Sequence, residues 1–554
     1  MKRFNIIQAL FFIVIVLPLN SFSTTPLPGQ IVGTYGTADL YGNELPYCLV
    51  NSPGGGYLIC GEAFPGGDGG NSNILLTRID STGQLIWSTQ LGGSSSEFAY
   101  GMTKASDGSY LIAGCSLSIY PLMWTSWLLK IDDSGNVVWQ KAYGNDGVNR
   151  DEILRQVAPS MDGNFISVGG VLDTESQGLI IKFDTDGNLI WKKKVRTSSV
   201  RFDNLKILED GGFLTWGADW QTDVSWLFRF DPDGNLLWAK EFDESLGGLY
   251  DVSKALNGDY LLAMHHVDYV DHGYPVMIRL APDGNVVWAK KLVVPYDKWD
   301  YDNNVWVHQI FPKGDGNFIA FSEFSAYIYN DEYYGGNGII QFNEDGTMGG
   351  IVLINYGPFG TNQYSSHGAV IAPDGNLAYC AGAFYTYSID YCLVKTGEGN
   401  KIEGNCAANI EVPLLWEDYW APAPSARTIQ VGSMNLTCAD TSSLNLISQP
   451  ATRGLNTFCP VIYTVNKLQN PFRLEILGDN LYGPGGYYSP QVLIDAVPVP
   501  QTTVKSPTRM VAKKDSALKI MIPKGVPVCV QIRAVDSAGG EYPLYKSDCF
   551  TFTR

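Results

Sequence analysis

The residues best suited to chemistry are histidines and carboxylates gathered in one short segment. His265, His266 and His272 lie there beside Asp268 and Asp271. Imidazole nitrogens and carboxylate oxygens bind divalent metals, so the three histidines are weak candidates for a metal site. The run HHVDYVDH matches no established ligand spacing, however, and histidines in a solvated loop explain it more simply. We therefore predict no metal ion and no cofactor.

A second group combines aromatic rings with acidic residues. Surfaces that bind sugars or peptides use rings for stacking and polar groups for hydrogen bonds. The candidate ligand-binding residues are Trp124, Trp220, Tyr269, Tyr274, Trp299, Asp300, Tyr301 and Tyr333. They lie in or beside long segments that do not recur along the chain, and such variable loops usually carry function. The alternative is that many of these rings pack long loops onto a scaffold.

No motif in the sequence indicates a catalytic centre. A nucleophile elbow, a phosphate-binding loop, a Cys-x-x-Cys pair and a zinc-protease helix are all absent from the sequence. We select no catalytic residues. Hydrolases and lyases that assemble their acids from separate loops leave no such motif, so enzymatic activity stays open as an alternative.

These residues must be positioned by a repeated scaffold, because in five strand-turn-strand segments Gly is followed four residues later by Trp. The pairs are Gly83/Trp87, Gly135/Trp139, Gly187/Trp191, Gly234/Trp238 and Gly284/Trp288. A second signature, Gly followed two residues later by Tyr, Phe or Leu between two short apolar runs, has seven copies in the same register. They begin at Gly55, Gly108, Gly163, Gly211, Gly258, Gly316 and Gly375. A repeat of about fifty residues without a helical period predicts an all-β fold, a seven-bladed β-propeller of four-stranded blades.

The last copy lacks a convincing final strand. Residues 30–36 resemble the end of a Trp strand, residues 138–144. We predict that this N-terminal segment supplies the outer strand of the last blade beside residues 391–395 and closes the ring. In the repeated turns we expect Asp to cap the turn, Gly to adopt positive φ and Trp to pack between blades.

The phrases RIDSTGQLIW, KIDDSGNVVW and RFDPDGNLLW carry a family resemblance. They are similar to the seven-bladed propellers of bacterial exported proteins with LIKxDxxGNxxWxKxYGG-type repeats, and the match covers residues 30–400. Quinoprotein dehydrogenases and sialidases carry related phrases with a different spacing, and the quinone-binding pair of adjacent cysteines is absent from this sequence. We therefore interpret the Asp/Gly/Trp phrase as structural.

The repeats end near residue 400, and two further parts follow. Residues 401–462 lose the period and collect Pro and small polar residues, which predicts a partly ordered linker. Residues 463–554 show short strands that predict an immunoglobulin-like β-sandwich. The phrases LEILGDNLYGPGG and LKIMIPKG resemble the TIG/IPT family, which implies a spacer or interaction module without catalytic residues.

The N-terminus has the layout of a secretory signal peptide. Lys2 and Arg3 precede an apolar run, and small residues follow near Ser23, so we assign residues 1–23 to the signal and 24–400 to the propeller. This predicts a secreted or cell-surface protein without membrane insertion. The net charge of −18 argues against a nucleic-acid partner, because phosphate binding needs a basic face. The oligomeric state is left open.

Ten cysteines in an exported chain favour disulfides. Cysteines that flank a turn symmetrically predict three cross-strand bridges, and a fourth pair brackets the linker. The pairs are Cys48 with Cys60, Cys380 with Cys392, Cys529 with Cys549, and Cys406 with Cys459. Buried free thiols facing each other are the alternative for the three cross-strand pairs.

These observations favour a non-enzymatic exported or cell-surface binding protein. We expect it to recognise a glycan or an extracellular protein through the aromatic, acidic loop face of the propeller. A carbohydrate-active enzyme, either a glycosidase or a polysaccharide lyase, using the same face is the first alternative. A structural component of an extracellular assembly is the second.

Overall fold

The computed structural model describes most of the chain outside its first 29 residues. The described residues are 30–35, 43–64, 71–120, 123–143, 151–172, 176–196, 200–219, 224–267, 273–293, 304–313, 316–327, 333–343, 345–355, 368–384, 389–400, 408–410, 415–418, 425–426, 430–433, 439–440, 447–450, 461–468, 473–479, 481, 489–506, 509–512, 516–535, 541–546 and 550–554. The predicted signal peptide lies outside them. Within these ranges no helix is long and apolar enough to cross a membrane.

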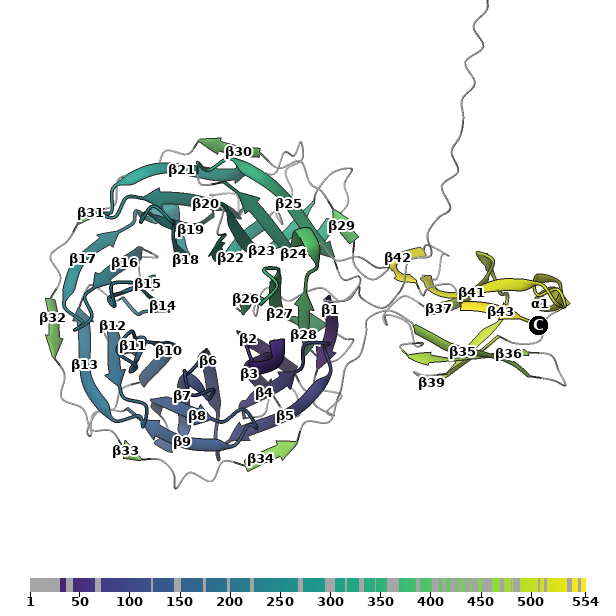
Figure 1. Ribbon diagram of the computed structural model, residues 1–554, viewed down its shortest axis with the longest axis horizontal. Coiled ribbons are helices and arrows are strands. Elements are labelled where there is room, and N and C mark those ends of the chain that lie inside the picture. The colour runs from purple at the N-terminus through teal and green to yellow at the C-terminus, as the bar shows by residue number, and fades with distance from the viewer. Residues whose placement is uncertain are drawn as a thin grey trace, which may run out of the picture.

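The described chain is all-β and repeats an antiparallel four-stranded sheet, and the sheets stand around a ring (Figure 1). The first sheet contains β2 (Asn43–Asn51), β3 (Tyr57–Phe64), β4 (Asn73–Ile79) and β5 (Leu85–Gly92). The second contains β6 (Glu97–Lys104), β7 (Tyr110–Tyr120), β8 (Met123–Ile131) and β9 (Val137–Ala142). The third contains β10 (Asp151–Pro159), β11 (Phe165–Leu172), β12 (Gln177–Phe183) and β13 (Leu189–Arg196).

The same order continues through the rest of the ring. The fourth sheet contains β14 (Asn204–Ile207), β15 (Phe213–Ala218), β16 (Ser225–Phe230) and β17 (Leu236–Glu241). The fifth contains β18 (Gly248–Lys254), β19 (Tyr260–Val267), β20 (Gly273–Leu280) and β21 (Val286–Val293). The sixth contains β22 (Asn304–Pro312), β23 (Phe318–Tyr327), β24 (Tyr333–Phe342) and β25 (Met348–Asn355). The last joins β26 (Ala369–Ile371), β27 (Leu377–Phe384) and β28 (Ile389–Lys395) to the N-terminal strand β1 (Ile31–Tyr35).

The predicted pairing of the N-terminal segment is confirmed for β1. This strand runs antiparallel to β28, with Ile31 opposite Lys395 and Tyr35 opposite Tyr391. The Tyr35 hydroxyl donates a 2.6 Å hydrogen bond to the carbonyl of Gly83 in the first sheet. Tyr143 makes the same bond to Gly187, also at 2.6 Å. The closing strand therefore reproduces the contact between consecutive sheets elsewhere in the ring.

The repeated Asp/Gly/Trp turn is structural, as predicted. Asp184 accepts hydrogen bonds from the backbone N–H groups of Asp186 and Asn188 and so caps its turn. Trp139 of the preceding sheet donates its indole N–H to the Thr185 carbonyl at 3.1 Å. Its ring is half-buried and covers Gly187, which has φ 76°. Glycine is required there because the backbone is left-handed and because an indole occupies the space of a side chain.

Gly187→Ala is expected to destabilise the protein more than Gly163→Ala does. Both positions have positive φ, which costs an L-residue about 1–2 kcal/mol. A Cβ at Gly187 would lie 3.0 Å from the Trp139 ring, whereas one at Gly163 would meet nothing within 4 Å. Displacing the indole should add roughly 1–3 kcal/mol. Urea unfolding of the two variants measures the difference, and equal costs would contradict the inter-sheet contact.

The two predicted disulfides of the ring are wrong. Cys48, Cys60, Cys380 and Cys392 are all free and buried. Cys48 and Cys60 face each other across β2 and β3, but the Cys48 thiol donates to the carbonyl of Tyr100 at 3.0 Å. Burial raises the pKa of that thiol to about 12.

The second ring pair fails because of register. Cys380 is opposite Leu393 and Cys392 is opposite Ala381, so the two cysteines are one residue out of register. A shift of one residue places two side chains on opposite faces of a sheet. Their thiols accordingly belong to different hydrophobic clusters. Cys529 is disulfide-bonded, but Cys549, Cys406 and Cys459 lie outside the described residues, so those pairings stay predictions.

Two further sheets follow the ring and share one core. One contains β35 (Val461–Leu468), β36 (Arg473–Asp479), β39 (Thr502–Ser506) and β40 (Arg509–Ala512). The other contains β37 (Ser489–Ile494), β38 (Val497–Pro498), β41 (Pro527–Val535), β42 (Glu541–Lys546) and β43 (Phe550–Thr553). Ile476 of β36 and Met510 of β40 pack with Val492 of β37 and Ile532 of β41. Leu518 of the helix α1 (Ser516–Met521) belongs to the same core.

Candidate functional site

A β-bulge recurs in the inner strands of the ring. Shifts of register lie at equivalent places in β2, β6, β10, β18 and β22. The residues that these shifts leave outside the ladder, here called the bulge residues, are Tyr47, Tyr100, Arg155, Tyr250 and His308. Figure 1 shows that these strands surround the centre of the ring. Bulges re-aim side chains and are common beside active sites, so the bulge residues are candidate functional residues.

Two bulge residues begin a row of aromatic rings. The ring centroids of Tyr47 and Tyr100 are 6.0 Å apart. Phe98 stacks at 5.9 Å on Tyr100 with an angle of 12° between the ring planes, and its centroid is 4.9 Å from that of Trp124. All four rings are half-buried. We call this set, Tyr47, Tyr100, Phe98 and Trp124, the aromatic ladder.

The aromatic ladder runs from the bulges toward the long loops. Phe98 is the second residue of β6 and Trp124 the second of β8. Both therefore lie at the strand ends opposite the short Gly turns. Variable loops leave the ring on this side, so the ladder connects the inner strands with the face that the sequence analysis selected.

One cation and two carboxyls flank the aromatic ladder. The Arg155 guanidinium lies 4.4 Å from the centroid of the Tyr100 ring, a cation–π contact. Burial raises the pKa of Glu62 to about 8, while hydrogen bonds from Tyr47 and Ser72 oppose that rise. Burial therefore favours the neutral form of the Glu62 carboxyl. The Asp151 carboxylate accepts the backbone N–H of Trp124 at 2.8 Å and fixes the start of β8.

A second cluster surrounds the other two bulge residues. The His265 ring stacks on Trp306 with centroids 5.2 Å apart, and Tyr250 meets the rings of His265 and His308 edge-on. The His308 Nε2 atom lies 3.3 Å from the Glu323 carboxylate. Burial lowers the pKa of His265 to about 3 and that of His308 to about 4, so both imidazoles are neutral at physiological pH.

The three histidines of HHVDYVDH do not come together as a metal site in the described structure. His265 is buried, so the expectation of a solvated loop histidine is wrong for this residue. His266 is half-buried with its ring 5.1 Å from Tyr274, and His272 lies outside the described residues. Among the residues that the structure describes, no three His, Cys, Asp or Glu side chains form a metal-binding group.

The other predicted site residues divide into four sets. Trp124 belongs to the aromatic ladder, whereas Tyr274 of β20 packs against His266 and beneath the ammonium of Lys291. Tyr333 is the first residue of β24. The remaining predicted residues lie outside the described part of the chain: Trp220, Tyr269, Trp299, Asp300 and Tyr301.

The sequence analysis missed Tyr47, Phe98, Tyr100 and Arg155 because these residues lie in strands. A signal for the bulge residues was nevertheless present. Each stands eight residues before the Gly of the following turn, as Tyr47 does before Gly55. Asp203 and His367 hold the same position in the fourth and last copies.

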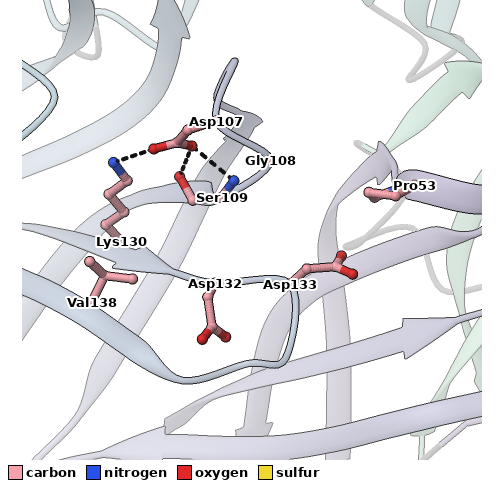
Figure 2. Close-up of a pocket in the computed structure, with 8 residues that line it drawn as sticks. All are labelled: Pro53, Asp107, Gly108, Ser109, Lys130, Asp132, Asp133 and Val138. Carbon is pink, nitrogen blue, oxygen red and sulfur yellow. Dashed lines mark hydrogen bonds and ion pairs between the residues drawn. The ribbon is translucent and has the colours of Figure 1, made fainter.

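A pocket of 360 Å³ lies on the opposite face, among the short turns of the first two sheets (Figure 2). Lys130 bonds to Asp107 at 2.9 Å and to the carbonyl of Thr185 in the third sheet. Asp133 accepts hydrogen bonds from Tyr110 and Arg78. Equivalent ion pairs recur between Lys182 and Asp162, Arg229 and Asp210, Arg279 and Asp259, and Lys395 and Asp374. The pocket is therefore one copy of a repeated structural seam, and we assign no ligand to it.

Comparisons with known proteins give only weak similarities. Neither a family model nor a curated protein matches the chain. A solved protein of unknown function from Dyadobacter fermentans is 12% identical, with 68% of this chain and 100% of that chain covered and a TM-score of 0.37. One from Bacteroides caccae is 14% identical, with coverages of 58% and 92% and a TM-score of 0.32. An exo-β-1,3-galactanase from Clostridium thermocellum is 14% identical, with coverages of 55% and 73% and a TM-score of 0.28. Likenesses at this level carry no argument about function.

Proposed function

We propose that the protein is an exported, non-enzymatic binding protein that holds a glycan on the aromatic ladder. In this proposal residues 24–400 form a seven-bladed β-propeller closed by β1, and residues 463–554 form an immunoglobulin-like sandwich. The observation that carries the functional proposal is the continuous row of four half-buried rings beside Arg155. The shared core of the two C-terminal sheets supports the sandwich, and the N-terminal apolar run supports export.

The chemistry of the aromatic ladder suits a sugar. Apolar faces of a pyranose ring stack on aromatic side chains, and the hydroxyl groups need convergent polar partners. Arg155 offers donors beside Tyr100, the second ring of the ladder, and burial favours the neutral form of the Glu62 carboxyl. A neutral or acidic glycan is therefore favoured over a basic peptide.

The described carboxyls support binding of a glycan without its cleavage. Glycosidases work with two carboxyls that flank the scissile bond, one of them as a proton donor. Near the aromatic ladder, Glu62 hydrogen-bonds with Tyr47 and Ser72, and Asp151 holds the backbone of Trp124. Both groups thus maintain the site, and the glycosidase or lyase alternative is tested by product analysis.

Trp124→Ala is expected to weaken binding of a glycan found by array screening of the mature protein by at least about tenfold, or ~1.4 kcal/mol. The affinity falls because the variant lacks the ring at the end of the ladder that lies toward the long loops. Calorimetric titration measures it. Trp306→Ala removes another half-buried Trp outside the ladder and should leave the affinity unchanged. Equal effects of the two variants would contradict the proposed site, and released sugars would favour the enzyme.

A further inference from the structure

The described part of the segment predicted as a linker contains six short strands along the ring. They are β29 (Ala408–Ile410), β30 (Leu415–Asp418), β31 (Ser425–Ala426), β32 (Gln430–Ser433), β33 (Ala439–Asp440) and β34 (Ile447–Pro450). Each pairs antiparallel with the outer strand of one sheet: β29 with β25, β30 with β21, β31 with β17, β32 with β13, β33 with β9 and β34 with β5. Figure 1 shows them around the outside of the ring.

We propose that residues 408–450 are a strap, and that the outer edges of the six sheets form a strand-addition surface whose occupant is this strap. The outer strand of a sheet presents unpaired N–H and C=O groups, which recruit any extended chain. Addition of a strand to such an edge is a general mode of peptide recognition, because main-chain hydrogen bonds supply the affinity. Here the peptide is part of the same chain.

The strap passes the sheets in the reverse of their order in the sequence. It begins at β25 of the sixth sheet and ends at β5 of the first. These two sheets flank the last sheet, where β1 and β28 close the ring. The strap therefore pairs with the two sheets that flank the last sheet. It also pairs with the other four sheets of the ring.

The register of the strap also matches charges at two sheets. Asp418 and Glu417 stand opposite Lys290 and Lys291 of β21. Asp440 stands opposite Lys141 of β9. Opposite charges directly across an antiparallel ladder are favourable, whereas like charges are not. Lysines on an edge strand also disfavour pairing with the same edge of another copy of this protein. An acidic strap therefore suits these edges better than the edge of a second ring does.

The strap must act as one multivalent ligand. Its strands have between two and four residues. A pairing of that length is marginal in water by itself. Six pairings on one chain raise each other's effective concentration, so the strap should stay bound when its covalent link to the ring is cut.

The test is cleavage of the full chain at a protease site inserted between Asn400 and Ala408. After cleavage under reducing, native conditions, the C-terminal fragment should co-elute with the ring in gel filtration and separate only in denaturant. Separation without denaturant would overturn the proposal. Hydrogen exchange provides a second readout, because amides of β5, β9 and β13 should exchange faster once denaturant and dilution have removed the strap.

A second protease site between Pro450 and Val461 distinguishes the strap from the C-terminal sheets. When both sites are cut, the piece that contains residues 408–450 should stay with the ring. Loss of this piece while residues 461–554 remain bound would assign the attachment to the C-terminal sheets and overturn the proposal. Neither readout depends on the glycan, so failure of the proposed function leaves this test unaffected.

Discussion

A chain that lacks residues 30–35 should lose more than about 5 kcal/mol of stability, because the deletion removes the closing strand of the ring. Ile31 and Tyr35 are only 3% and 1% exposed. Truncating one such side chain costs roughly 2–5 kcal/mol. The deletion also bares the edge of β28 and breaks the bond from Tyr35 to Gly83. Guanidinium unfolding of the mature chain followed by tryptophan fluorescence measures the loss.

Point variants keep this prediction testable when the deleted chain fails to fold. Tyr35→Phe removes one buried hydrogen bond and should cost about 1 kcal/mol. Tyr143→Phe removes the equivalent bond between the second and third sheets, so its cost should be similar. An unchanged midpoint after deletion of residues 30–35, or a Tyr143 effect without a Tyr35 effect, would show that β1 does not close the ring.

The repeated turns and the closing strand were predictable because their chemistry is local. A left-handed Gly beside an indole restricts the residue type, so the phrase recurs in sequence. Ile31 holds the place of Trp139 in the alignment of the two strands, and it covers Gly83 as Trp139 covers Gly187. Residues 30–36 could therefore be recognised as an outer strand although the Trp itself is missing.

The strap was not predictable in the same way. Its strands are short and bind through backbone groups, which every residue type carries, so no side-chain pattern marks them.

The aromatic ladder was only partly predictable, for another reason. A bulge interrupts the alternation of buried and exposed residues that identifies a strand, and its meaning depends on which neighbouring strand it faces. Trp124 was selected as an exposed loop residue, whereas its contact with Phe98 reaches across β7, which lies between β6 and β8 in the sheet.

Lys192→Met should destabilise the protein by about 3–5 kcal/mol, because it leaves a carboxylate buried without its partner. The side chains of Lys192 and Glu152 are 0% and 1% exposed, and Nζ lies 3.2 Å from Oε2. The Glu152 Oε1 atom has no hydrogen-bond partner among the described residues. Lys192 is therefore the main group that stabilises the negative charge of this carboxylate. Burial lowers the pKa of Lys192 to about 8, although Glu152 opposes that change. Desolvation therefore outweighs the attraction within the pair.

The matched control for this variant is the double variant Glu152→Met with Lys192→Met. It removes both charges at similar volume, and replacing a buried ion pair by hydrophobic residues of similar volume is often close to neutral in stability. The double variant should therefore recover most of the stability that Lys192→Met loses, as measured by urea unfolding of the three proteins. If the double variant is as unstable as the single one, the loss comes from packing of the lysine stem in the third sheet. The uncompensated carboxylate would then not be the cause.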